Sequence, residues 1–298
     1  MIIQQWCKFS HLFLLILLVL QGCSVGNENQ DAIDEVPSLP VQVSRNIRYS
    51  YLLRNDTAKI LDNIEVLIMA PLSRTPFQTL KSLKVNEEYR VIEDSYYRHT
   101  LDIKVGSLAP FEQREIKVSA SVLLTNIEKA FQFENSDAFV MEEVFVEANH
   151  PDIQPIAQML KGETEEETLS AIHDWITAEI SKTGFMKASR GALSTLRSKT
   201  GDCTEFGYLT SALARYHKIP SSLMGGFKVE GDSVLSARTY HNWNLLFTDG
   251  SWQLVDTFDD AFRDEETSYI AFETIAEEGP QSSRQSKVAE GYTLRLQD

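Results

Sequence analysis

The dipeptide Asp249-Gly250 restricts the fold of this chain more than any other feature, because it predicts a β-hairpin and its register. Asp-Gly is a strong signal for a two-residue turn between paired strands. It lies between two runs rich in apolar residues, His241–Phe247 and Trp252–Phe258. With Asp249 and Gly250 as the turn, Thr248 faces Ser251, and the rest of the pairing follows.

This register brings two polar side chains together on one face of the hairpin. Trp243 faces Asp256 and His241 faces Phe258, so His241 and Asp256 are diagonal neighbours within side-chain reach. The other members of that face are all apolar: Trp243, Leu245, Phe247, Trp252, Leu254 and Phe258. The opposite face is mainly polar: Asn242, Asn244, Ser251, Gln253 and Thr257, with Leu246 and Val255 as exceptions. We therefore expect His241 and Asp256 to project toward the core and to pair, because an unpaired polar group is costly to bury.

A cysteine precedes the hairpin at the start of a predicted helix. The sequence Gly201-Asp202-Cys203 opens a helix over Thr204–Tyr216, whose inward residues are Phe206, Leu209, Ala212 and Leu213. Gly201 permits an unusual turn and Asp202 can cap the helix. Unpaired amides and the positive end of the helix dipole favour a thiolate at Cys203. The same amides could donate to an oxyanion formed when the sulfur attacks a carbonyl.

These three residues supply the parts that thiol catalysis needs. A base removes the proton from sulfur, and a third group orients the base and stabilises its charged form. The sequence predicts Cys203 as nucleophile, His241 as base and Asp256 as the orienting group. Taken singly, each has a structural alternative: an inert buried cysteine, a satisfied core histidine and a turn-side carboxylate. Their combination favours the catalytic interpretation.

The stretch from Thr164 to Phe258 resembles the core of the transglutaminase-like (papain-related) superfamily. The resemblance is carried by Gly201-Asp202-Cys203, Ile219-Pro220, His241-Asn242-Trp243 and the spacing from Trp252 to Asp256. It implies an α+β fold in which the helix carrying the cysteine packs on an antiparallel sheet, preceded by an N-terminal β-sandwich. It also implies acyl transfer through a thioester. Trp243 is a candidate substrate-binding residue.

The chain departs from the family pattern at two of these motifs. Members commonly have Asp-Pro-Thr at the last motif, where this chain has Asp256-Thr257-Phe258, and Ala-Arg after Ile-Pro, where it has Ser221-Ser222. The calcium-dependent animal enzymes carry a tryptophan beside the cysteine and a calcium loop, and neither is recognisable here. These departures leave the triad in place but argue against protein crosslinking.

Hydrophobic periodicity outlines the remaining elements. Alternating residues predict strands with Ile47, Tyr49, Tyr51 and Leu53, with Ile116, Val118, Ala120, Val122 and Leu124, and over Ile64–Met69, Tyr89–Glu93 and Leu101–Val105. We therefore predict a β-sandwich domain at 43–127 and a transglutaminase-like domain at 128–298.

In the second domain, Thr164 and Glu167 form a capping-box signature before the apolar stripe Leu169, Ile172, Ile176 and Ile180. A short helix over Ala192–Arg197 and strands over Ser222–Val229, Thr239–Phe247 and Trp252–Asp256 complete the prediction.

The N-terminus has the pattern of a bacterial lipoprotein signal. Residues 1–22 carry one lysine and the apolar run Leu12–Leu20, which is short for a membrane span. The sequence Leu20-Gln21-Gly22-Cys23 resembles a lipobox, in which Cys23 becomes the lipidated N-terminus. Ser24 favours the outer membrane, facing the periplasm, and residues 23–42 form a polar tether. The alternative is an ordinary signal peptide with an incidental cysteine.

Charge and cysteine content exclude several classes of function. The net charge of −15 disfavours nucleic-acid binding. Removal of Cys7 with the signal and lipidation of Cys23 leave Cys203 as one free thiol without a disulfide partner. The histidines His99, His150, His173 and His217 lack metal-ligand spacing, so we expect neither a metal nor a cofactor. The acidic residues from Asp259 to Glu266 predict a solvated loop, with a substrate-selecting rim as the alternative.

The sequence thus predicts a lipid-anchored thiol enzyme of the cell envelope that acts on amide bonds of peptides or proteins. Hydrolysis is favoured over transamidation, because no amine site is recognisable. Two alternatives remain open: a non-catalytic scaffold lipoprotein, and an enzyme that processes peptidoglycan peptides. Expected partners are a peptide or protein substrate, the membrane through the lipid anchor, and an envelope protein for the β-sandwich.

Overall fold

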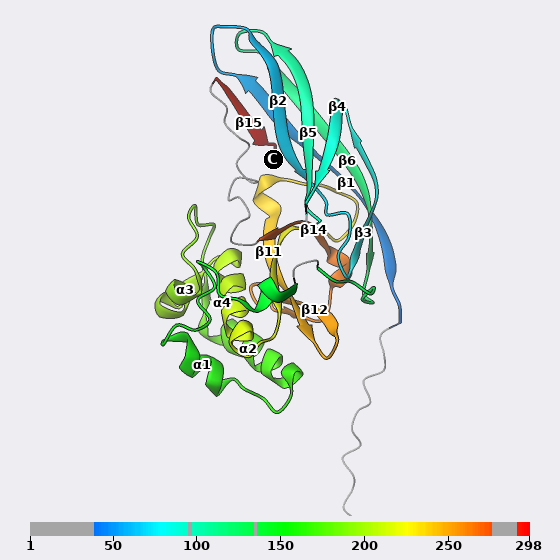
Figure 1. Ribbon diagram of the computed structural model, residues 1–298. Helices are drawn as coiled ribbons and strands as arrows, with labels where there is room; N and C mark the ends of the chain where they lie inside the picture. Colours follow the sequence, from blue (N-terminus) through cyan, green and yellow to red (C-terminus); the bar gives the residue numbers. More distant parts are fainter. Residues whose placement is uncertain (1–38, 95–96, 134–135, 276–290) are drawn as a thin grey trace, which may run out of the picture. The chain divides into compact units, whose positions relative to one another are not determined.

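The computed structural model describes residues 39–94, 97–133, 136–275 and 291–298 (Figure 1). Residues 40–298 form one compact unit, which is the unit described below. The predicted signal, Cys23 and most of the predicted tether lie outside the described residues. Within the described residues, no helix combines the length and the apolar character needed to cross a membrane.

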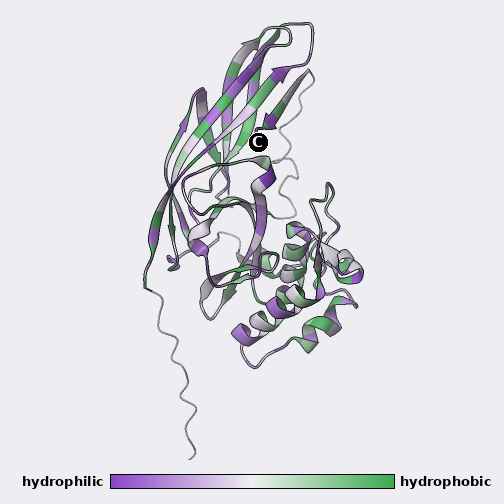
Figure 2. Cartoon of the chain, turned by 180° about the vertical axis from the view of Figure 1, so that it is seen from behind, coloured by the Kyte–Doolittle hydropathy of each residue, from purple (hydrophilic) through white to green (hydrophobic). Residues whose placement is uncertain are grey.

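The N-terminal part is a β-sandwich. One sheet has the order β10-β1-β6-β3, and β15 also pairs with β1. The other has the order β2-β5-β4. The strands of the first sheet are β1 (Gln42–Asn55), β3 (Gln78–Val85), β6 (Gln113–Thr125), β10 (Ser233–Val234) and β15 (Tyr292–Leu296), and those of the second are β2 (Leu61–Ala70), β4 (Glu88–Glu93) and β5 (His99–Leu108). Buried and exposed residues alternate along β1, β2 and β6, and Figure 2 shows this alternation of hydropathy.

The predicted sandwich is confirmed, and the chain returns to it twice. The strands predicted around Ile47–Leu53 and Ile116–Leu124 are the central pair β1 and β6. The sequence did not indicate β3, β10 or β15. Strands β10 and β15 come from the C-terminal half of the chain and pair with β1. The predicted boundary between residues 127 and 128 remains a prediction.

The second part is an antiparallel sheet with helices beside it (Figure 1). Its strand order is β13-β12-β11-β9-β14. The strands are β9 (Ser221–Lys228), β11 (Tyr240–Thr248), β12 (Ser251–Asp256), β13 (Ala261–Phe262) and β14 (Tyr269–Ile275). The helices are α1 (Ile153–Met159), α2 (Glu165–Glu179), α3 (Ala192–Ser198) and α4 (Cys203–Tyr216), with 3-10 turns η1 (Ser136–Val140), η2 (Ala237–Thr239) and η3 (Glu266–Ser268) and a short parallel pair β7 (Ser181–Lys182) and β8 (Thr200–Gly201).

Local signals placed the helix starts and the hairpin correctly. Thr164 and Glu167 form the predicted capping box at α2, and Asp202 caps α4 by accepting the Thr204 amide at 2.9 Å. The hairpin of β11 and β12 has the predicted register, from Thr248 opposite Ser251 to Asn244 opposite Val255.

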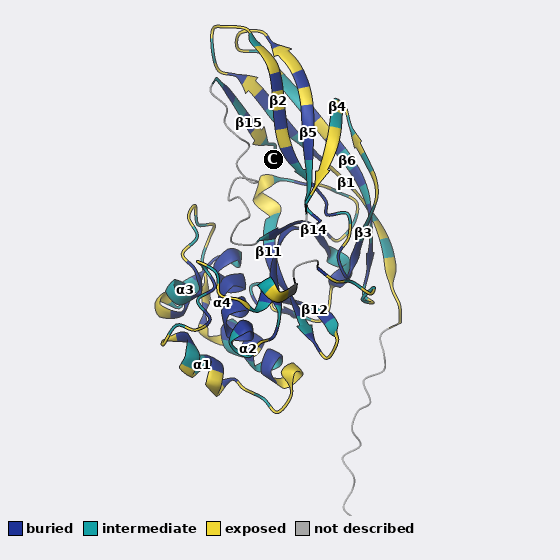
Figure 3. Ribbon diagram, in the orientation of Figure 1, coloured by how far each residue is buried: buried dark blue, intermediate teal, exposed yellow. Residues whose placement is uncertain are grey.

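The mainly polar face of this hairpin is largely buried as well. Asn242 and Asn244 are each 1% exposed because α4 packs over that face. Figure 3 shows α4 almost entirely buried. Gly207 allows this close packing, since a Cβ there would lie 2.2 Å from Leu223 of β9. The Asn244 amide donates to the Gly207 carbonyl at 3.1 Å, so a polar residue is satisfied inside the core.

A buried glutamine joins the two parts. Gln78 of β3 is 1% exposed and donates to the carbonyls of Leu72 and Ala271 at 2.9 and 3.0 Å. Its Oε1 accepts the amide of Ala271, in β14, at 2.8 Å. The apolar core of the sandwich also contains Phe227 of β9 and Ile270 and Phe272 of β14, which belong to the helix-covered sheet. The sandwich is therefore fixed to the edge of the helix-covered sheet.

Replacement of Gln78 by leucine should lower the free energy of unfolding by about 2–3 kcal/mol. The leucine fills a similar volume but leaves the buried amide and carbonyl of Ala271 without these partners. Chemical denaturation measures the change, with Gln113→Leu at an exposed position of β6 as the matched control. Equal stability of the two variants would contradict the role given to Gln78.

Candidate active site

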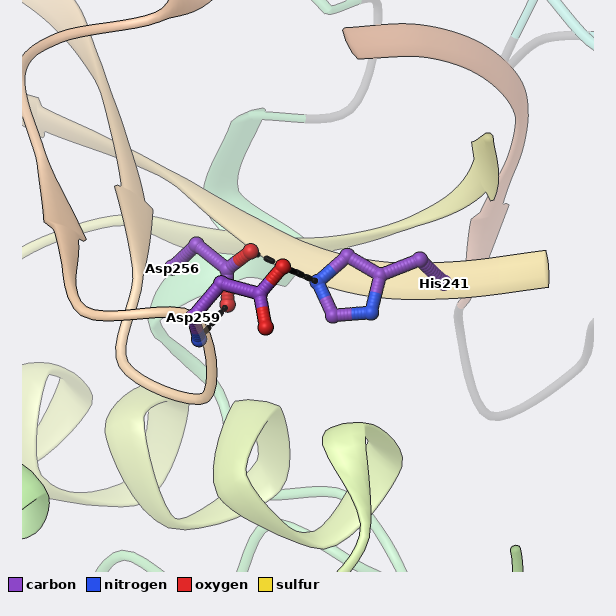
Figure 4. Close-up of side chains that lie close together, drawn as sticks. All are labelled: His241, Asp256 and Asp259. Atoms are coloured by element: carbon purple, nitrogen blue, oxygen red, sulfur yellow. Dashed lines mark hydrogen bonds and ion pairs between the residues drawn. The ribbon is translucent and has the colours of Figure 1, made fainter. Parts of the chain in front are cut away.

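The structure brings His241 and Asp256 together as predicted. His241 lies near the start of β11 and Asp256 ends β12. The Nε2 atom of His241 lies 2.6 Å from Oδ2 of Asp256, a direct hydrogen bond (Figure 4). Asp256 is 1% exposed, whereas the His241 side chain is 12% exposed and lines a cavity.

Asp256 is held by donors that the sequence did not reveal. Its Oδ1 accepts the amides of Phe258 and Asp259 at 3.1 and 3.0 Å. Its Oδ2 also accepts the hydroxyl of Tyr269, from β14, at 2.8 Å. Burial alone would raise the pKa of Asp256, but the bonds to His241, the Asp259 amide and Tyr269 keep this pKa below its usual value. Asp256 is therefore a carboxylate at neutral pH.

Cys203 begins α4 and is half-buried, with its thiol directed at an asparagine that the sequence analysis did not single out. The Sγ atom lies 3.6 Å from Oδ1 of Asn242, which also accepts the Thr204 hydroxyl at 3.0 Å. The Asn242 side-chain amide donates to the Met224 carbonyl at 3.0 Å, which fixes its orientation. Asn242 follows His241 directly in β11. Only its place in the sequence His241-Asn242-Trp243 could have indicated that it contacts the thiol.

The charge on His241 is set by its neighbours. Burial disfavours the imidazolium, but hydrogen bonds and charge interactions with Asp256 and Cys203 outweigh it and raise the pKa of His241 to about 10. His241 is therefore protonated at neutral pH. The imidazolium therefore interacts with the Asp256 carboxylate on one side and with the Cys203 sulfur on the other.

A second buried carboxyl lies next to the cysteine. Glu205, in the first turn of α4, is 1% exposed, and its Oε1 accepts the Arg190 amide at 3.0 Å. Its Oε2 is buried without a donor among the described residues. Burial and the neighbouring Asp202 raise the pKa of Glu205 to about 7, while hydrogen bonds including that with Glu205 hold the pKa of Asp202 below its usual value despite burial. A proton on Glu205 shared with Asp202 satisfies both groups.

The acidic loop after β12 approaches the site through Asp259. Its Oδ2 lies 3.9 Å from Nε2 of His241, and Figure 4 shows the three side chains together. Donor atoms of His241, Asp256 and Asp259 lie within 4.8 Å of one another, a spacing that could hold a metal ion. The same Nε2 and Oδ2 atoms, however, form the 2.6 Å hydrogen bond, which an ion would have to displace. The geometry therefore suits proton transfer better than metal binding.

The other predicted site residues lie apart from the thiol. Trp243 is 3% exposed and packs its ring 5.0 Å from that of Tyr269, within the core. Cys203, His241 and Asn242 line a cavity of about 850 Å³, and Trp243 is not among its lining residues. Its assignment to substrate binding stays a prediction that this burial does not favour.

A family match and one solved structure agree with the fold. Residues 154–257 match the model of the transglutaminase-like superfamily. A candidate cysteine protease from Cytophaga hutchinsonii is 14% identical, with a TM-score of 0.60, and the alignment covers 86% of this chain and 88% of that one. The periplasmic domain of TgpA from Pseudomonas aeruginosa is 12% identical over 72% of this chain and 90% of that one, with a TM-score of 0.38. No curated protein matches the sequence.

The imidazole of His241 should titrate with a midpoint near pH 10 and remain charged at pH 7. Because this pKa is raised, its contribution to stability is fully present below about pH 6.5 and is lost as the pH rises through 10. Asp256→Asn removes the carboxylate and should lower the midpoint to the usual value of 6.5 or below. NMR of the ring nitrogens measures both, with His241→Gln to assign the signal. A wild-type midpoint below pH 7 would contradict this electrostatic description.

Glu205→Gln should change how stability depends on pH. A raised carboxyl pKa contributes stability below about pH 4.5, which is lost as the pH rises through 7. The glutamine donates to Asp202 at every pH and does not lose this contribution. The free energy of unfolding of the variant, relative to wild type, should therefore rise by about 2–3 kcal/mol as the pH increases from 4.5 to 8. Denaturation at several pH values measures the difference. Glu88→Gln, at a position with a 79% exposed side chain, is the control and should show no such trend. A difference independent of pH would rule out the shared proton.

Proposed function

We propose that this chain, which contains a transglutaminase-like core, is a thiol enzyme acting on amide bonds of peptides or proteins. Cys203 is the nucleophile, His241 the general acid and base, and Asp256 the residue that orients and charges the imidazole. The 2.6 Å bond between His241 and the buried Asp256, beside a cavity lined by Cys203, is the observation that carries the proposal. The family match over residues 154–257 supports it.

The reaction follows from the charges at the site. The Cys203 thiolate attacks the carbonyl carbon of the substrate and forms a C–S bond, and the carbonyl oxygen becomes an oxyanion. The His241 imidazolium then gives its proton to the leaving nitrogen as the C–N bond breaks, which leaves a thioester. Water or an amine attacks the thioester and loses its proton to His241, and the thiolate is regenerated.

The oxyanion requires donors near Cys203, and several first-turn amides of α4 are already engaged. The backbone amides of Thr204 and Glu205 donate to the side chain of Asp202, and the Phe206 amide donates to the Asp202 carbonyl. We assign the backbone amide of Cys203 to the oxyanion, because it is the first-turn donor not committed to Asp202.

The cellular location belongs to the same proposal and rests on sequence. The apolar run before Leu20-Gln21-Gly22-Cys23 is the reason to place the enzyme at the cell envelope, anchored by lipid on Cys23. An enzyme held there by a flexible tether would meet peptides and proteins of the periplasm. Water is the favoured acceptor, so we assign hydrolysis rather than crosslinking.

The full-length protein should react with iodoacetamide at Cys203 at pH 7 at least tenfold faster than its His241→Ala variant, because the imidazolium stabilises the thiolate. Mass spectrometry of the peptide containing Cys203 measures the rate. His150→Ala removes a histidine remote from the site and should react like wild type. Incubation with cell-envelope extract should also leave an acyl adduct on Cys203. Slow labelling unaffected by His241→Ala, with no adduct, would favour the scaffold alternative.

A further inference from the structure

The cavity beside Cys203 is enclosed from two sides by different parts of the fold. One side carries Cys203 and His241. The other side comes from the β-sandwich, through Tyr49 of β1, Met69 of β2 and Leu296 of β15. At about 850 Å³ the cavity is larger than one side chain needs, and it extends from the thiol to the sandwich. The sandwich is therefore part of the surface that a substrate meets.

The wall between the thiol and the sandwich is a run of aromatic rings, which we call the aromatic wall: Tyr51, Tyr49, Phe272, Phe227 and Tyr240. Successive ring centroids lie 6.2, 5.6, 4.9 and 5.7 Å apart, all edge to face. All five rings line the cavity. The run ends at Tyr240, directly before the base His241.

The hydroxyls of the aromatic wall bind protein atoms. The Tyr49 hydroxyl donates to the Met69 carbonyl at 2.9 Å, and the Tyr240 hydroxyl donates to Glu273. Burial, followed by the nearby Glu273, raises the pKa of Tyr51 above its usual value, so that ring also stays neutral. Tyr49, Phe227 and Phe272 are 2–4% exposed, so they back the cavity as packed core, and its accessible apolar surface comes from the half-buried Tyr240, Met69 and Leu296.

Cations on the same cavity already have carboxylate partners. Lys228 pairs with Glu265 at 2.8 Å and with Asp259 at 3.4 Å. Arg238 pairs with Asp298 at 3.0 Å. Among the described lining residues the lysine and the arginine are thus paired with carboxylates, and the His241 imidazolium is paired with Asp256, so burial of apolar surface is the main source of affinity.

We infer that the β-sandwich forms the substrate-selecting wall of the active site, and that the acyl donor inserts a large apolar side chain against Met69, Leu296 and Tyr240, the half-buried lining that the aromatic wall supports. This inference rests on the proposed function of Cys203. It assigns the enzyme to apolar stretches of peptide or protein substrates. It also separates these from peptidoglycan stem peptides, whose carboxylates would find the lysine and the arginine of the described lining already paired.

Peptidyl chloromethyl ketones test the inference, because the Cys203 thiolate displaces chloride and forms a stable C–S bond. Four dipeptide probes are compared on the full-length protein: Gly-Gly, Phe-Gly, Gly-Phe and Glu-Gly. At least one phenylalanine probe should alkylate Cys203 tenfold or more faster than Gly-Gly, and Glu-Gly should be no faster than Gly-Gly. Equal rates for the phenylalanine and glycine probes, or a preference for Glu-Gly, would overturn the inference.

The contribution of the sandwich is tested by Met69→Glu, which places a charge on the far wall. This variant should reduce the phenylalanine preference to about threefold or less. Leu67→Glu lies on the same strand at an exposed position outside the cavity lining, and should keep the preference. Leu296→Glu replaces Met69→Glu if circular dichroism shows that the latter is unfolded. A full preference in a folded wall variant would exclude the sandwich from substrate selection.

Iodoacetamide separates this inference from the proposed function. It is too small to need the aromatic wall, so its rate at Cys203 should be the same in wild type and in the Leu67→Glu variant. Rapid labelling that depends on His241, together with no selectivity among the peptide probes, would refute only the inference about the wall. Slow labelling that is independent of His241 would refute the proposed function itself.

Discussion

The candidate site depends on a single buried contact, the hydrogen bond between His241 and Asp256. A carboxylate at 1% exposure is costly unless its oxygens are bonded, and Asp256 meets this condition with two backbone amides, a tyrosine hydroxyl and the imidazole. These donors come from β11, from the turn after β12 and from β14. The order of the strands in the sheet is therefore what makes the charged pair stable.

The strand β11 serves the site with two successive residues. Side chains alternate across a strand, so His241 turns toward Asp256 while Asn242 turns toward α4. Gly207 lets α4 lie close against β9, and the buried Arg215 anchors its other end by donating to the Ser221 carbonyl and pairing with Glu143. Helix and strand are thus fixed at both ends, which holds the sulfur at a constant distance from β11.

The sequence predicted those features that are encoded locally. The Asp249-Gly250 turn gave the hairpin register and the capping residues gave the helix starts, because each acts over a few residues. The strand β14 escaped prediction, and Tyr269 with it, because its place beside β9 depends on a long-range pairing. The packing of α4 over the face that carries Asn242 and Asn244 was not predictable for a related reason. Polar side chains normally indicate solvent, but here they bond to the carbonyls and hydroxyls of packed elements.

The joining of sandwich and core has a consequence for how such a site works. Gln78 bonds β3 to β14, and β14 also supplies Tyr269 to Asp256 and Phe272 to the aromatic wall. A displacement of the sandwich would therefore disturb both the wall and the carboxylate that charges the base. The bonds that Gln78 makes between the two parts are buried, which favours a single arrangement of the two. Under the proposed function, the shape and chemistry of a preformed cavity then select the substrate.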